Sequence, residues 1–275
     1  MWRLAVMKRC GVLMRLLLRA LCSAAVIATP AIAQSESKAE LKFLCAGALK
    51  AAMGTLLQEF ASKTGNQVQV AYGPIGQNAQ RIRNGEVADL AVISPEQWDG
   101  LRDDGKIDDQ FRVVVGKVGI GTFVRKGAPR PGIATVEAFK RALLDAPAIA
   151  VGDPARGTPV GAYVLPLFGR LGIAEAVKPK LRLAVPGTDA GTRGSVYDLV
   201  RRGDAEIGFA QMAEASEVPE VDLVAPLPAE IQHYTIFTLA IPLRARDPAR
   251  ARVLADFLTS VRAVSVLKAK GIDPG

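Results

Sequence analysis

The residues of this 275-residue chain that could do chemistry lie at four strand-to-helix junctions. In each, a short apolar strand runs into a Gly- or Pro-rich loop and then a helix start; the strands are 41–46, 68–71, 149–151 and 181–185. A helix start leaves backbone N–H groups unpaired at the positive end of the helix dipole. In open α/β sheets such loops meet at the carboxyl ends of the strands, where ligands bind. We therefore expect a site that holds a small anion through backbone N–H groups.

Catalytic side chains have little support in the sequence. His233 is the sole histidine, and the chain has no cysteine cluster and no nucleophile-elbow motif. Segment 100–106 has the glycine and lysine spacing of a phosphate-binding loop, but no Ser or Thr follows the lysine and Asp103 and Asp104 would repel phosphate. We predict no catalytic residue, no metal site and no cofactor. A secreted hydrolase or isomerase on a related α/β fold stays open as the alternative class, since it would require a nucleophile and a base to meet in the cleft.

The elements that must position these loops alternate between strand and helix. Further strands are expected at 90–93, 111–115, 120–125, 207–210 and 234–240. Helices are expected at 48–62, 95–104, 136–144, 160–171, 196–202 and 248–259. This order predicts an α/β protein with mostly parallel sheets flanked by helices.

Two apolar runs are candidates for crossings between two lobes. Run 113–125 contains Gly116, Gly119 and Gly121, and run 234–240 precedes the C-terminal helices. If the chain leaves and returns through them, lobe I comprises 41–118 plus 239–275, and lobe II comprises 119–238. Two strands that join two lobes form a hinge, so we expect a ligand cleft between the lobes.

The N-terminal segment reads as an export signal. Residues 1–33 contain five basic residues, an apolar run and a final Ala-Ile-Ala, which predicts cleavage before Gln34 and a periplasmic protein; 34–40 form a polar leader. Removing this segment lowers the formal net charge from +8 to +3 and leaves Cys45 as the single cysteine, expected to be buried in its strand. Aromatic residues are few and no basic stripe is interleaved with them, so we expect no nucleic-acid partner.

Several short motifs then occur in one order along the chain: LCAGAL at 44–49, ADLAVIS at 88–94, VRKG at 124–127, DPARGTPVGAY at 153–163 and LVRRGDAEIG at 199–208. Together they resemble the periplasmic molybdate-type solute-binding proteins of ABC importers, over almost the whole chain after the signal. The resemblance implies a type II periplasmic binding-protein fold with two lobes joined by crossover strands. It also implies a monomer that captures a molybdate- or tungstate-like oxyanion in the cleft and delivers it to an inner-membrane permease.

The resemblance also implies a site. The positions at which the family has Ser, Ser and Tyr side-chain donors correspond here to Ala48, Gly76 and Gln211, while backbone donors correspond to Val160 and Arg193. Polar side chains that could replace the missing hydroxyls belong to Gln77, Asn78, Thr158, Ser195 and Gln211. Because hydroxyl donors are replaced while the helix starts remain, a small organic acid stays open as the alternative ligand.

Overall fold

The computed structural model describes residues 40–185 and 194–275. The predicted signal peptide, its cleavage site before Gln34 and the candidate ligand residue Arg193 lie outside these residues. Within them, no helix is long and apolar enough to cross a membrane.

The strands are β1 (Leu41–Ala46), β2 (Val68–Gly73), β3 (Leu90–Ile93), β4 (Val113–Arg125), β5 (Ile149–Gly152), β6 (Leu181–Ala184), β7 (Ile207–Gln211), β8 (Val221–Pro226), β9 (Tyr234–Ala240) and β10 (Asp273–Pro274). The α-helices are α1 (Lys50–Thr64), α2 (Ile75–Arg83), α3 (Pro95–Asp103), α4 (Val136–Asp145), α5 (Pro159–Arg170), α6 (Ala174–Val177), α7 (Val196–Arg202), α8 (Pro248–Leu258) and α9 (Val261–Ala269). The 3-10 helices are η1 (Gly47–Leu49), η2 (Pro154–Arg156), η3 (Lys178–Lys180), η4 (Met212–Glu217) and η5 (Ala229–Ile231).

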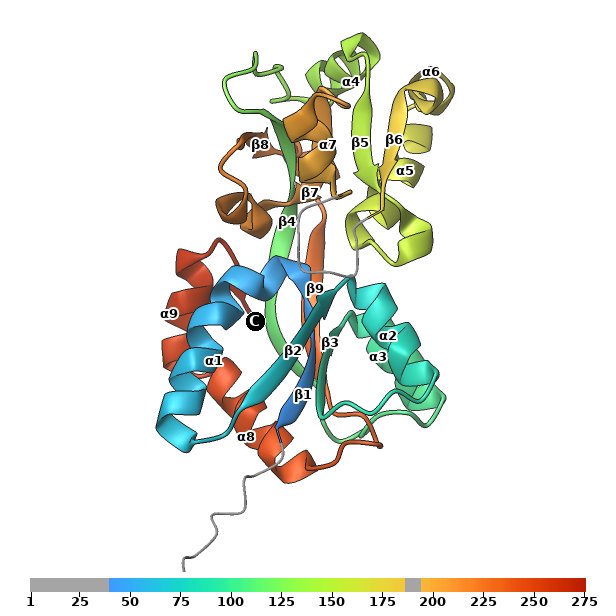
Figure 1. Cartoon of the computed structure of the whole chain (residues 1–275). Helices are drawn as coiled ribbons and strands as arrows, with labels where there is room; N and C mark the ends of the chain where they lie inside the picture. The colour runs from blue at the N-terminus through green and yellow to red at the C-terminus, as the bar shows by residue number, and fades with distance from the viewer. Residues whose placement is uncertain (1–39, 186–193) are drawn as a thin grey trace, which may run out of the picture. The chain divides into compact units, whose positions relative to one another are not determined.

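The first sheet has the order β2-β1-β3-β9-β4, with β10 pairing β4 (Figure 1). Strands β1, β2 and β3 are parallel, whereas β9 is antiparallel to both β3 and β4. One buried cluster joins this sheet to α1, α8 and α9, and a second joins it to α2 and α3. The sheet is therefore covered by helices on both faces and forms one lobe.

The second sheet has the order β4-β7-β5-β6, and β8 also pairs with β4. Strand β5 is parallel to β6 and β7, while β4 is antiparallel to β7. One cluster packs this sheet against α4, α5 and α6, and another packs it against α7. This second lobe gives the protein the predicted two-lobed α/β architecture. The sheets are mixed rather than mostly parallel, because β4 and β9 run antiparallel to the strands they pair with.

Strand β4 belongs to both sheets. Its first part, to Gly119, pairs with β9, and its second part, from Ile120, pairs with β7 and β8. The expectation of two separate strands at 111–115 and 120–125 is wrong, because the ladder continues through the glycines between them. A Cβ at Gly119 would lie 2.8 Å from Met212 Cε, and one at Gly121 would lie 2.6 Å from Leu223 Cδ1, so these glycines permit close packing.

The lobe boundaries remain a proposal. The change of partners between Gly119 and Ile120 favours the predicted first crossing. Strand β9 pairs with the first sheet from Tyr234 onwards, which favours a second crossing before β9 rather than inside it at 238.

Candidate functional site

A cavity of about 240 Å³ lies between the two sheets. Its wall includes the last residues of five strands: Ala46 of β1, Gly73 of β2, Gly152 of β5, Ala184 of β6 and Gln211 of β7. The carboxyl ends of the strands of both lobes thus meet at this cavity, as predicted for the four junctions. Most of the other wall residues are apolar; they include Tyr72, Ile75, Val160, Phe209 and Phe237.

Three of the helix starts at the cavity lack a capping side chain. No side chain caps η1, which leads into α1, and none caps α2 or α5. By contrast, α3, α4, α8 and α9 each begin with a capping side chain, from Ser94, Thr135, Asp247 and Ser260 respectively. A capping side chain satisfies one of the N–H groups at a helix start. Its absence at the cavity leaves those groups to a ligand.

Helix α5 illustrates how the sequence produces an uncapped start. Thr158 occupies the capping position, but its hydroxyl donates to the Asp153 carbonyl at 2.8 Å instead of accepting from the helix. Pro159 follows, and Val160 lines the cavity in the first turn. Helix α7 is different, because Ser195 Oγ accepts from the Asp198 N–H at 3.2 Å.

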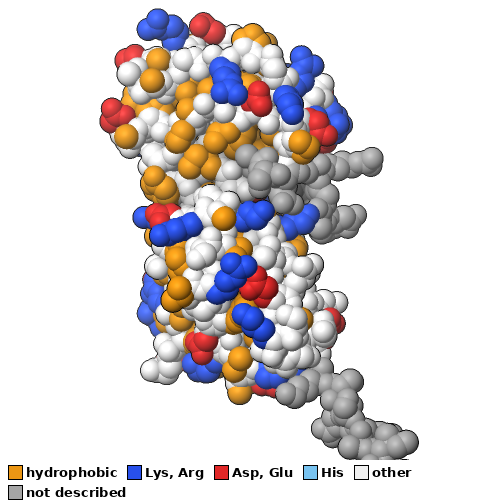
Figure 2. All heavy atoms as spheres, turned by 90° about the vertical axis from the view of Figure 1, so that its left-hand side faces the viewer, with side chains coloured by type: hydrophobic (Ala, Val, Ile, Leu, Met, Phe, Trp, Pro, Cys, Tyr) orange, Lys and Arg blue, Asp and Glu red, His pale blue; other side chains and the backbone are white. Residues whose placement is uncertain are grey.

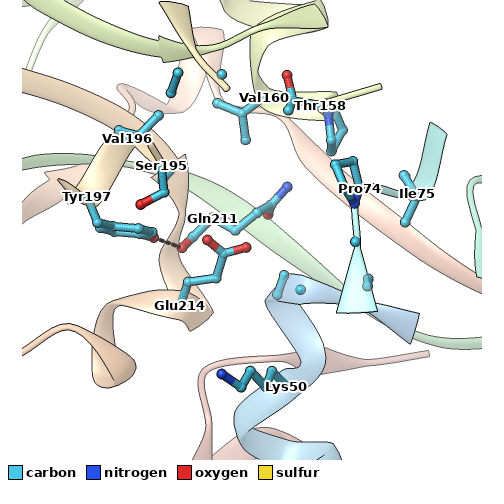
Figure 3. Close-up of a pocket in the computed structure, with 18 of the residues that line it drawn as sticks. Lys50, Pro74, Ile75, Thr158, Val160, Ser195, Val196, Tyr197, Gln211 and Glu214 are labelled. Carbon is cyan, nitrogen blue, oxygen red and sulfur yellow. Dashed lines mark hydrogen bonds between the residues drawn. The ribbon is translucent and has the colours of Figure 1, made fainter. Parts of the chain in front are cut away.

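Among the described residues, the cavity is lined by two tyrosines, Tyr72 and Tyr197, and by five other polar side chains: Lys50, Thr158, Ser195, Gln211 and Glu214 (Figure 3). These five come from α1, from the two helix starts of the second lobe, from the end of β7 and from η4. Gln211 Nε2 donates to Thr235 Oγ1 at 2.6 Å, whereas its buried Oε1 has no hydrogen-bond partner. A ligand with a donor group could satisfy this oxygen.

Glu214 has an unusual environment for a carboxyl group. Its Oε1 lies 3.8 Å from where a Cβ on Gly47 would stand, at the start of η1 in the other lobe. On its other side is Tyr197, whose hydroxyl donates to the Gln211 carbonyl at 2.8 Å (Figure 3). Burial raises the pKa of Glu214 to about 7, and burial together with Glu214 raises that of Tyr197 well above its ordinary value. Near neutral pH this carboxyl can therefore both take up and release a proton.

The structure brings together only part of the predicted site. Ala48, Thr158, Val160, Ser195 and Gln211 line the cavity. Their positions follow from the strand-to-helix junctions, as the sequence predicts.

Three other predicted residues lie outside the wall, all near the start of α2. Gly76 donates its N–H to the Gly157 carbonyl at 3.3 Å, and Gln77 is exposed. Asn78 is fully buried, and its Nδ2 donates to the carbonyls of Cys45 at 3.3 Å and Val92 at 3.0 Å. The Asn78 amide thus joins the ends of β1 and β3, which is a structural role.

Sequence reasoning missed Lys50, Tyr197 and Glu214. Each belongs to an ordinary helical segment without a motif, so no local signal marks them. His233 lies elsewhere, stacked on Tyr163 with ring centroids 4.3 Å apart. Among the described residues, no group of three metal-ligating side chains could hold a metal ion.

The chain belongs to the family of bacterial extracellular solute-binding proteins, whose model matches residues 41–273. Aconitate isomerase from a Pseudomonas species is 28% identical over 256 residues, which cover 91% of this chain and 94% of that protein. The molybdate-binding protein ModA of Azotobacter vinelandii is 24% identical over 252 residues, 87% of this chain and 92% of that protein.

Solved structures share the fold. The periplasmic molybdate-binding protein of Azotobacter vinelandii superposes with a TM-score of 0.67 at 20% identity, covering 86% of this chain and all of that one. PEB3 with bound L-phospholactate superposes with a TM-score of 0.65 at 17% identity and the same coverage. The predicted resemblance to molybdate-type periplasmic binding proteins and the predicted fold class are confirmed.

Proposed function

We propose that this protein is the periplasmic solute-binding component of an ABC importer and that its ligand is a small organic acid. The observation that carries the proposal is one cavity wall that combines uncapped helix starts, a mostly apolar surface and the carboxyl group of Glu214. The helix starts suit a carboxylate, and the apolar wall suits a carbon skeleton.

The size and lining of the cavity support an organic ligand, since its volume is about 240 Å³ and much of its wall is apolar. A tetrahedral oxyanion has a central atom and four oxygens, and it offers no apolar surface to contact Ile75, Val160 or Phe209. An acid with several carbon atoms would fill more of the space and bury apolar area.

Glu214 also favours an organic acid. When ionised, it repels a compact anion wherever that anion sits in so small a cavity. An organic acid can place a carboxylate at the start of α2 or of α5, on the side opposite Glu214, and direct its carbon chain toward Glu214. Each ligand class is supported by one relative. The aconitate isomerase, whose name points to an organic acid, is 28% identical to this chain, and the molybdate-binding protein is 24% identical.

Molybdate or tungstate remains the alternative ligand. The expectation rests on the resemblance to molybdate-type proteins, but the three hydroxyl donors that it implies are replaced by Ala48, Gly76 and Gln211. A buried anion loses about 1–3 kcal/mol for each missing partner.

The test is calorimetric titration of the purified protein with molybdate, tungstate, sulfate, citrate and both geometric isomers of aconitate. We expect micromolar or tighter binding of at least one polycarboxylate and much weaker binding of the inorganic ions. Selective, tight binding of molybdate with no response to the organic acids would overturn the proposal.

An isomerase is the second candidate function. Two observations favour it: the relative named aconitate isomerase, and Glu214 as a group that can exchange protons inside the cavity. Incubation with cis- or trans-aconitate followed by proton NMR tests it, because the two isomers give separate vinyl signals. Conversion that requires the protein would favour the enzyme, and binding without conversion would favour the importer component.

The remaining parts of the proposal concern location and partners. Export and delivery to an inner-membrane permease fit membership of the solute-binding family. Cleavage before Gln34 is proposed from the sequence of the N-terminal segment, and a monomeric state from the resemblance to the molybdate-type proteins. On the face in Figure 2, basic and acidic side chains are scattered over both lobes rather than gathered in one stripe. N-terminal sequencing of the exported protein tests the cleavage site.

A further inference from the structure

We propose that Glu214 is a catalytic base that moves a proton between two carbon atoms of a bound unsaturated carboxylic acid, so that the pocket shifts a double bond. This inference rests on the second candidate function, the isomerase, and on the proposed organic-acid ligand, and it assigns the chemistry of the site to named groups. It names the residue that moves the proton and the proton-transfer step. Membership of the solute-binding family specifies neither of them.

The position of Glu214 is the first argument. Its carboxyl group points into the cavity from η4, on the side opposite the starts of α2 and α5 (Figure 3). Helix η4 packs against η1 and α1 of the first lobe as well as β4 and β8 of the second. Glu214 is thus held where both lobes meet, facing any ligand that spans the cavity.

The surroundings of Glu214 give it the acidity that a base needs at neutral pH. Burial raises its pKa to about 7, near the value at which a group is most effective in general acid–base catalysis. The other titratable side chains of the cavity wall are Lys50 from α1, Tyr72 from β2 and Tyr197 from α7. On β4 and β8, Lys117 lies 3.2 Å from Asp273 and Asp222 lies 3.6 Å from Arg130, while Arg125 is exposed; none of them is part of the cavity wall.

The step needs no co-reactant. The ionised Glu214 carboxylate removes a proton from a methylene carbon that lies next to both a carboxylate and a carbon–carbon double bond. The electron pair of that C–H bond forms a new double bond, and the former double bond shifts its electrons to its far carbon. Protonated Glu214 then returns the proton to that far carbon. The composition of the acid is unchanged, and the base is regenerated.

The helix starts stabilise the charge that develops in this step. Removal of the proton increases the negative charge on the carboxylate beside the methylene carbon. The starts of η1 and α5 lie at the cavity wall and no side chain caps them. N–H groups fixed at such a start can stabilise a developing oxyanion without reorganising. Lys50, the first residue of α1, adds a positive charge to the same wall.

The experiment follows hydrogen exchange rather than net conversion alone. The purified protein is incubated with cis-aconitate in D₂O, and deuterium at the methylene and vinyl carbons is followed by NMR, with affinity measured separately by calorimetry. We expect deuterium uptake by the wild type and a loss of about 10²- to 10⁴-fold in the exchange rate of Glu214→Gln. Affinity should change by less than tenfold, because glutamine keeps the size of the side chain.

Two further variants sharpen the result. Glu214→Asp should retain partial exchange, because it keeps a carboxylate at a shorter reach. Glu137→Gln should match the wild type, because Glu137 is an exposed residue of α4 whose partner is Lys140. Binding of cis-aconitate without exchange by the wild type, or equal exchange by Glu214→Gln, would overturn this inference while leaving the proposed ligand class intact. Absence of binding by every organic acid would overturn both.

Discussion

Gly76 and Gly157 meet backbone to backbone between the two lobes. The Gly76 N–H donates to the Gly157 carbonyl at 3.3 Å, and a Cβ at Gly76 would stand 2.7 Å from Gly157 Cα. Gly157 has a φ of 75°, in the left-handed region that glycine adopts without strain. The contact lies beside the cavity, between the start of α2 in one lobe and the loop before α5 in the other. No side chain fits at position 76 while these two segments touch.

Gly76→Ala is therefore expected to weaken ligand binding. The added methyl group would press on backbone that cannot move aside, which typically costs 1–3 kcal/mol, or about 5- to 150-fold in affinity. Titration of the variant with the best organic acid measures this loss. The same argument applies to serine, the residue that the molybdate-type resemblance implies at this position.

The matched control is Gly54→Ala in α1, where a Cβ would meet nothing within 4 Å. This change should leave affinity unchanged and stabilise the protein by about 0.5–1 kcal/mol, because alanine favours the helix. Unchanged affinity in Gly76→Ala would show that the contact between Gly76 and Gly157 is irrelevant to the ligand-bound form.

Val160 allows a test of backbone recognition. Val160→Pro removes one N–H at the start of α5 and should reduce affinity by about 10- to 150-fold, since a hydrogen bond to a charged group contributes about 1.5–3 kcal/mol. Val160→Ala keeps the N–H and should mainly lower the melting temperature, because the side chain is buried in the core of its lobe. Calorimetry and circular dichroism on both variants separate the two effects. Equal losses of affinity in two folded variants would argue against recognition through the backbone.

Glu214 should make stability depend on pH. Its folded pKa of about 7 exceeds the ordinary value of a glutamate side chain, so the unfolded chain releases this proton first as the pH rises. The stabilisation is fully present below the unfolded pKa and is lost as the pH rises to about 7, with a total of no more than about 3 kcal/mol. Glu214→Gln cannot ionise and should be more stable than the wild type at about pH 8 but not at about pH 4.

Urea denaturation of both proteins across this pH range gives the measurement. A constant difference in the free energy of unfolding between them would mean that Glu214 keeps an ordinary pKa. The outcome bears also on catalysis, because a group with an ordinary pKa would be a weak base at neutral pH.

Asn78 is expected to act on stability rather than on ligand choice. Asn78→Ala leaves the carbonyls of Cys45 and Val92 without this donor at the ends of β1 and β3. Each lost hydrogen bond contributes about 0.5–1.5 kcal/mol, so the free energy of unfolding should fall by about 1–3 kcal/mol. Chemical denaturation measures the loss, and the ranking of ligands in titrations should stay the same. A changed ranking with normal stability would return Asn78 to the list of ligand residues.

The sequence by itself predicted most of the strands and the helix starts that lie at the cavity. These features are local, because a run of apolar residues followed by Gly or Pro restricts the backbone of the same segment. Ala48, Thr158, Val160 and Ser195 could therefore be placed at the cavity from their junctions alone. The fold class followed from the alternation of elements and from motifs that occur in one order.

Only the tertiary structure decided which side chains share the cavity with those helix starts. Lys50, Tyr197 and Glu214 are far apart in the chain and meet because η4 packs against η1 and α1. Tertiary contacts elsewhere give Asn78 its role between β1 and β3 and place Gly76 against Gly157. Burial, which raises the pKa of Glu214, is a property of this packing and has no counterpart in local residue patterns.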